Sequence, residues 1–205
     1  MAPMATLVTQ GELFGFAQPL PNGLVYRPDF VAAEEETALL AAIEALPLKE
    51  AQYKEYTAKR RVIGFGSRYD YVTNDLVAAP PLPPFLYALK LRIAQWLDIP
   101  DSRFVHALIT EYRPGTPIGW HRDAPHFEAV VGVSLRGWCR MRFRPRRAKS
   151  GSKDVAVLDL APRSVYVMQG AVRWDWHHSI APTKDLRYSI TFRTLSSLNA
   201  GSATA

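Results

Sequence analysis

The sequence predicts an α+β fold in which two helices buttress one side of an antiparallel sandwich or jelly roll. Two amphipathic helical segments lie in the first half, and from residue 103 onward apolar and polar residues alternate with a period of two. Gly, Pro and Asp interrupt this second region at short intervals. Helices followed by short strands are typical of α+β domains, and turn signals every ~8–12 residues are typical of sandwiches and jelly rolls.

The composition favours one globular domain in a reducing compartment. The chain has 205 residues, of which 48% are hydrophobic and 21% are charged, so it is long enough to bury a core. Cys139 is its one cysteine, which excludes an internal disulfide framework. No apolar run approaches the ~20 residues that span a bilayer, and the N-terminus lacks a signal-peptide pattern. We therefore expect a cytoplasmic monomer without a membrane partner.

The first half predicts a short strand and the two helices. Residues 24–26 form the strand. In residues 34–46, leucine and isoleucine recur at helical spacing, three glutamates suit the positive N-terminal end, and Pro47 marks the stop. The proline-rich residues 80–84 form a stiff connector to a second amphipathic helix over residues 85–97.

Cations and aromatic residues are interleaved in residues 52–75. Stacking on aromatic rings and pairing of phosphates with arginine are how proteins hold single-stranded nucleic acid or a flipped base. An ordinary β-hairpin with cross-strand aromatic pairs explains the pattern equally well, and the two interpretations are compatible. The candidate substrate contacts in this segment are Arg60, Arg61, Phe65, Arg68, Tyr69 and Tyr71.

Alternation predicts a series of strands after residue 103. In one of them, Cys139, Met141 and Phe143 would face the core and the intervening arginines would face outward. The predicted strands are 104–112, 129–135, 139–144, 155–158, 164–168, 175–180 and 188–195.

The positive charge is concentrated in one segment. The net charge is +6, and residues 136–153 contain eight Lys or Arg residues and no acidic residue. Such a segment suits docking onto a polyanion such as nucleic acid, and a solvated loop is the alternative. Its candidate nucleic-acid contacts are Arg142, Arg144, Arg146 and Arg147.

Three residues have the pattern of a metal site. His121 and Asp123 stand two apart, so on an extended segment their side chains project to the same side and can grip one ion. A histidine from residues 177–178 would complete the two-His-one-carboxylate triad of non-haem Fe(II) oxygenases, which leaves one face of the metal open. His177 competes with His178, but neighbouring strand residues face opposite ways, so only one can point at the metal.

A later strand carries two arginines on one face. Arg187, Ser189, Thr191 and Arg193 alternate with three apolar residues that can pack into the core, so the polar set can line a cavity. The planar fork of arginine pairs with carboxylates in bidentate geometry. Two such arginines beside a metal triad imply a cosubstrate with two carboxylates.

Together these motifs resemble the AlkB family of Fe(II)/2-oxoglutarate dioxygenases. The matching pieces are His121-x-Asp123, His178-Ser179-Ile180 and the segment Arg-Tyr-Ser-Ile-Thr-Phe-Arg over 187–193, which is similar to the family's Arg-x-Asn-x-Thr-x-Arg. The resemblance implies a double-stranded β-helix, which is a jelly roll. Within one domain over residues 1–205, it implies an N-terminal extension with a substrate-recognition hairpin (1–100), a catalytic core (101–196) and a tail (197–205).

The resemblance also implies which residues act and on what. Fe(II), 2-oxoglutarate and O2 would be required. Ser189 and Thr110 stand where the family commonly has Asn, and both can still form hydrogen bonds with shorter reach. The implied metal ligands, which are also the catalytic residues, are His121, Asp123 and His178. The implied 2-oxoglutarate contacts are Arg187, Arg193, Tyr112, Ser189 and Thr110.

The implied reaction is oxidative demethylation of N-alkylated bases in single- or double-stranded DNA, or in RNA, with release of formaldehyde, succinate and CO2. Pro125 stands where some members carry an acidic residue that contacts the base, so that contact comes from elsewhere or the substrate differs. A hydroxylase or demethylase acting on tRNA or protein is the alternative. A non-catalytic jelly roll that binds nucleic acid is the third hypothesis.

Overall fold

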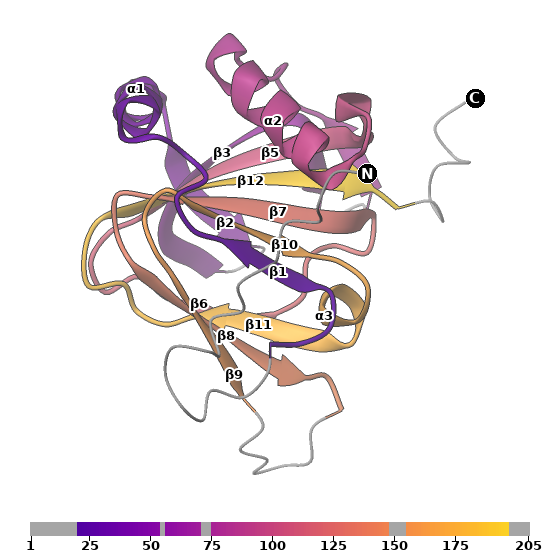
Figure 1. Cartoon of the computed structure of the whole chain (residues 1–205). Helices are drawn as coiled ribbons and strands as arrows, with labels where there is room; N and C mark the ends of the chain where they lie inside the picture. Colours follow the sequence, from indigo (N-terminus) through magenta and orange to yellow (C-terminus); the bar gives the residue numbers. More distant parts are fainter. Residues whose placement is uncertain (1–19, 54–55, 71–74, 148–154, 197–205) are drawn as a thin grey trace.

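In the computed structural model, which describes residues 20–53, 56–70, 75–147 and 155–196, two antiparallel sheets face each other (Figure 1). The strands are β1 (Leu24–Arg27), β2 (Lys49–Tyr53), β3 (Tyr56–Asp70), β4 (Asp75–Ala78), β5 (Phe104–Tyr112), β6 (Ile118–His121), β7 (Phe127–Leu135), β8 (Cys139–Pro145), β9 (Ala156–Leu160), β10 (Ser164–Met168), β11 (Trp176–Ile180) and β12 (Arg187–Leu195). The larger sheet has the order β1-β10-β7-β12-β5-β3-β2, with β4 paired to β3, and the smaller has the order β6-β11-β8-β9. The predicted α+β jelly roll is confirmed.

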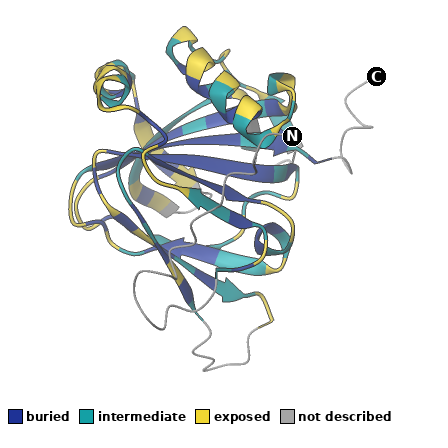
Figure 2. Cartoon of the chain, in the orientation of Figure 1, coloured by how far each residue is buried: buried dark blue, intermediate teal, exposed yellow. Residues whose placement is uncertain are grey.

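The helices α1 (Ala33–Glu44) and α2 (Tyr87–Leu97) cover the outer side of the larger sheet (Figure 1). Leu39, Ile43, Leu89 and Ile93 point from the helices into an apolar core that they share with Ile190 of β12. Burial of each such side chain contributes about 1.5–3 kcal/mol, and Figure 2 shows exposed residues on the opposite side of both helices. The helical elements are α1 (Ala33–Glu44), α2 (Tyr87–Leu97), α3 (Ala171–Trp174) and the 3₁₀ turns η2 (Pro84–Leu86) and η3 (Asp101–Arg103).

A second apolar core fills the space between the two sheets. Tyr112 and Val130 reach it from the larger sheet, and Met141 and Phe143 reach it from the smaller sheet. The alternation predicted for β8 is therefore confirmed, since the intervening Arg140 is exposed. This second core supports the floor of the cavity described below.

The sequence missed two short elements beside the site, β6 and α3. β6 has only four residues, too few for a period to be recognised. α3 ends at Trp174 with Asp175 as its C-cap, so the strand predicted from residue 175 begins one residue later. In the described parts of the chain, no helix has both the length and the apolar character needed to cross a membrane.

Candidate active site

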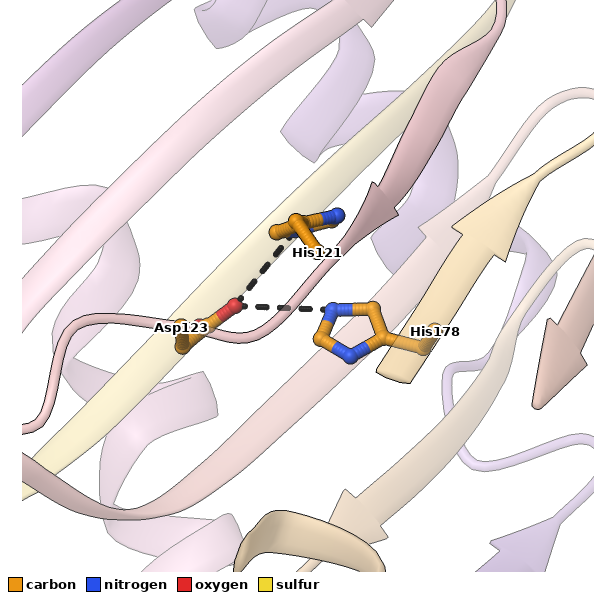
Figure 3. A group of neighbouring side chains, drawn as sticks. All are labelled: His121, Asp123 and His178. Atoms are coloured by element: carbon orange, nitrogen blue, oxygen red, sulfur yellow. Dashed lines mark ion pairs between the residues drawn. The ribbon is translucent and has the colours of Figure 1, made fainter. Parts of the chain in front are cut away.

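His121, Asp123 and His178 meet where the edge strand β6 pairs with β11 (Figure 3). The two histidines are cross-strand partners with ring centroids 4.2 Å apart. Oδ1 of Asp123, just beyond β6, lies 3.7 Å from Nε2 of His121 and 3.5 Å from Nε2 of His178. Their ligand atoms all lie within 4.8 Å of one another, as binding to one metal ion requires. The fold thus places His178 in this triad, whereas His177, its neighbour on the strand, is not part of it.

The charges of the triad suit a divalent metal. Burial, reinforced by the neighbouring His178, lowers the pKa of His121 to about 4, so its imidazole is neutral at pH 7. Burial alone would raise the pKa of Asp123, but Arg193 and both histidines hold it well below its usual value. A neutral imidazole and an ionised carboxylate are the protonation states in which these side chains ligate metals. Two imidazoles and one carboxylate are the donor set that suits Fe(II).

Arg193 fixes the carboxylate of Asp123 and is itself fixed by His106. Its Nε donates to Oδ2 of Asp123 at 2.6 Å, and its Nη1 lies 3.1 Å from Nδ1 of His106. Burial, together with the positive charge of Arg193, lowers the pKa of His106 to about 3, so the neutral ring accepts this hydrogen bond. The structure places His106 directly behind the carboxylate–guanidinium pair.

The buried His106 predicts how stability depends on pH. Its folded-state pKa of about 3 lies below its usual value of 6.5, so the unfolded chain binds more protons than the folded chain between these two pH values. The free energy of unfolding of the metal-free protein should therefore fall as the pH drops below 6.5, by up to about 1.4 kcal/mol per pH unit from this histidine. His106→Gln keeps an acceptor for Arg193 but removes one titration. Urea unfolding in a chelator across this range should show a shallower fall in the variant, and equal slopes would contradict the assignment.

The other predicted arginine, Arg187, is fully buried, and not all of its hydrogen-bond donors have partners in the described structure. Its Nε donates to Oγ of Ser134 at 2.9 Å, and its guanidinium carbon lies 4.9 Å from the ring centroid of Tyr112. Its Nη1 is buried and has no hydrogen-bond partner in the described structure. A buried guanidinium with an unused donor is costly unless an anion completes it. The residue therefore fits one carboxylate of a bound diacid.

A cavity of about 520 Å³ adjoins the metal triad. Its volume lies within the range of about 300–1,000 Å³ that small-molecule sites occupy. Cross-strand pairing of β5 with β12 places Tyr112 opposite Arg187 and Thr110 opposite Ser189. Thr110, Tyr112 and Ser189 line the cavity together with the metal triad, Thr191 and Arg193. The structure thus brings the predicted cosubstrate residues together, with Arg187 behind the ring of Tyr112.

A further arginine that the sequence did not reveal, Arg173 on α3, holds the loop that carries Asp123. It is only 3% exposed, and its Nη2 donates to the carbonyls of Ala124 at 2.6 Å and Phe127 at 2.7 Å, with the Asp123 carbonyl at 3.3 Å. Because α3 leads directly into β11, this contact ties the loop to the strand that supplies the second histidine. No local motif marks the role, since the loop approaches Arg173 only in the fold.

The substrate contacts predicted in residues 52–75 do not all face the cavity. Arg60 and Tyr69 line the cavity. The prediction is wrong for Phe65, which is buried in the core beneath the helices and cannot stack on a base. Arg61 also has a structural partner instead, because its guanidinium is paired with the buried carboxylate of Glu111. The side chain of Arg68 and all of Tyr71 lie outside the described residues.

The basic segment over residues 136–153 does not form one free positive surface, although its composition had suggested such a surface. Arg136 is paired with Glu44, and Arg140 is paired with Asp159, each at 2.8 Å. Residues 148–153 lie outside the described residues. The remaining candidates, which form no ion pair within the described chain, are Arg142, Arg144, Arg146 and Arg147.

Comparison with known proteins agrees with this geometry. The family model of the 2OG-Fe(II) oxygenase superfamily matches residues 23–193. The alkylated DNA repair protein ALKBH8 homolog of Arabidopsis thaliana is 28% identical over 80% of this chain and 53% of its own length. The tRNA (carboxymethyluridine(34)-5-O)-methyltransferase alkbh8 of Xenopus tropicalis is also 28% identical, over 80% of this chain and 26% of its own length. The chain therefore spans about half and about a quarter of these two relatives.

Among solved structures, the fold is similar to that of OsALKBH1. The TM-score is 0.66 at 15% identity, and the match covers 87% of this chain and 99% of the other. This likeness supports the jelly roll, while the family match covers both the metal triad and the arginine strand. The chain therefore belongs to the 2OG-Fe(II) oxygenase superfamily and is an oxidoreductase that uses Fe(II), 2-oxoglutarate and O2.

Proposed function

We propose that the protein oxidatively removes N-alkyl groups from bases in DNA or RNA. The observation that carries this proposal is the cavity, which is lined by the metal triad and by Arg60 and Tyr69 of β3. An aromatic ring and a cation beside the reacting centre suit an extruded base and its phosphate. The name of the Arabidopsis relative, an alkylated DNA repair protein homolog, points the same way.

The chain's own residues would orient the reactants and exclude water. His121, Asp123 and His178 would hold Fe(II), and Arg187, which lies behind Tyr112, would hold one carboxylate of 2-oxoglutarate. When bound, the iron supplies oxidising power by reacting O2 with 2-oxoglutarate. The product of hydroxylation at an N-alkyl carbon breaks down to an aldehyde and the free base. Tyr69 would stack on the extruded base and keep the N-alkyl carbon within the cavity.

A panel of modified oligonucleotides tests the proposal. It contains N1-methyladenine, N3-methylcytosine and etheno adducts in single- and double-stranded DNA and in RNA, with methylated peptides as the comparison class. We expect formaldehyde and succinate in equal amounts from at least one oligonucleotide, because a flipped or unpaired base costs only a few kcal/mol to present. Turnover of peptides alone, with no oligonucleotide processed, would contradict the proposal.

A tRNA substrate is the second candidate. It is favoured by Pro125, which puts no carboxylate at the position where some family members contact the base, and by the tRNA methyltransferase name of the Xenopus relative. That relative is about four times longer than the matched part, so its name describes more than this domain. Adding unmodified and modified tRNA to the panel separates the two candidates, because turnover of tRNA with none of short oligonucleotides would favour the second.

A further inference from the structure

Two arginines stack on one tryptophan on the outer face of the smaller sheet. His121 and Phe143 point inward, so their neighbours Trp120, Arg142 and Arg144 point outward. The guanidinium carbons of Arg142 and Arg144 lie 5.2 and 4.5 Å from the ring centroid of Trp120. We call these three residues the Trp–Arg platform. Stacking of this kind holds a guanidinium in place while its N–H donors stay available.

In the described structure, no carboxylate balances the positive charge of the platform. Among the residues that the structure describes, neither Arg142 nor Arg144 forms an ion pair, whereas Arg140, two positions earlier on the same face, is bound by Asp159. Arg142 and Arg144 stand two residues apart on β8, so their backbones lie ~6.6 Å apart. Two like charges at this spacing repel each other. A surface that holds them together in this way is complementary to a row of anions.

The platform lies on the reverse side of the strands that carry the metal ligands. Trp120 directly precedes His121 on the edge strand β6, and Nε of Arg142 donates at 3.1 Å to Oγ of Ser179 in β11. Arg122, next along the chain, is exposed, lines the cavity, and is anchored through Nη1 to the Trp174 carbonyl at 3.0 Å. Positive charge therefore continues from the platform around the edge of the sheet to the cavity.

We propose that the Trp–Arg platform binds the phosphodiester backbone of the nucleic-acid strand whose modified base enters the cavity. This inference rests on the proposed function and adds the path that the strand takes. Arginine forks pair with phosphate oxygens in bidentate geometry, and two forks at a strand spacing can engage neighbouring phosphates. The partner is thus a polyanion with regularly spaced charges, and Arg122 leads it toward the metal.

The test measures binding of a labelled oligothymidylate of about 15 nucleotides to the full chain by fluorescence anisotropy over a range of salt concentrations. The double variant Arg142→Gln/Arg144→Gln should bind roughly tenfold more weakly at low salt, and its log–log salt slope should fall by about 1.4, because two phosphate contacts are lost. Arg142→Lys/Arg144→Lys keeps both charges and should retain most of the slope. Arg140→Gln is the matched control, since that side chain is already paired with Asp159 and should change binding less than twofold.

Each outcome decides the proposal. If the wild type binds and demethylates oligonucleotides while the double glutamine variant keeps its affinity and salt slope, the platform is wrong and the proposed function stands. If Arg140→Gln weakens binding as much as the double variant, the effect is one of general charge and the platform is again wrong. If polyglutamate displaces the oligonucleotide from the platform at equal charge concentration, an acidic protein is the better partner. If no nucleic acid is bound or turned over by the wild type, the proposed function itself fails.

Discussion

Arg187→Met is expected to lower kcat/KM for 2-oxoglutarate at least about 100-fold while leaving the metal-free protein as stable as the wild type or more so. The wild-type guanidinium is fully buried, and in the described structure it has one hydrogen bond to Ser134 and no ion pair. Removal of a buried charge in favour of an apolar side chain of similar volume is often neutral or stabilising. Loss of a charge-assisted, bidentate contact to a carboxylate costs about 2–5 kcal/mol of binding, and 100-fold corresponds to about 2.7 kcal/mol.

The two readouts separate a ligand-binding role from a structural one. Succinate formation across a titration of 2-oxoglutarate gives the kinetic loss, and thermal unfolding in a chelator gives the stability. Arg187→Lys, which keeps the charge but not the planar fork, should recover only part of the activity. A large drop in melting temperature together with unchanged affinity for 2-oxoglutarate would show that Arg187 stabilises the fold and does not bind the diacid.

The residues that could be predicted from the sequence are those whose chemistry is fixed by spacing along one strand. Alternation on β12 puts Tyr188, Ile190 and Phe192 in the core under the helices and leaves Arg187 and Arg193 on the opposite face. That arrangement follows from the period of two alone. Which strand lies opposite, and therefore that Tyr112 meets Arg187, depends on sheet register and is visible only in the fold.

The hairpin shows why other residues could not be predicted. A period of two defines two faces of β3 but does not say which of them borders the cavity. Arg61 and Phe65 share the helix-facing side because β3 pairs with β5, where Glu111 and Ala107 lie opposite them. The buried Glu111 needs a cation in the folded state, and no local pattern in residues 52–75 reveals that requirement.

Asp123→Ala is expected to reduce Fe(II)-dependent turnover to the background of free iron and also to destabilise the metal-free protein by about 3–5 kcal/mol. The side chains of Asp123 and Arg193 are 6% and 13% exposed and are joined at 2.6 Å. Loss of the carboxylate removes one of three metal ligands and leaves the guanidinium buried with no anionic partner among the described residues, hydrogen-bonded to His106 and stacked on Phe127. Metal titration followed by spectroscopy and urea unfolding in a chelator measure the two effects separately.

A double variant separates the contribution of the Asp123–Arg193 ion pair to stability from the contribution of the Asp123 carboxylate to metal binding. Asp123→Leu/Arg193→Met removes both charges, so it should regain much of the stability that Asp123→Ala loses, because no buried charge is left unpaired. It should not regain metal binding, since the triad still lacks its carboxylate. His177→Ala serves as the matched control for the histidine ligands: it lies next to His178 but outside the triad, and its metal affinity should equal that of the wild type. If His177→Ala loses the metal and His178→Ala keeps it, the assignment of the triad is wrong.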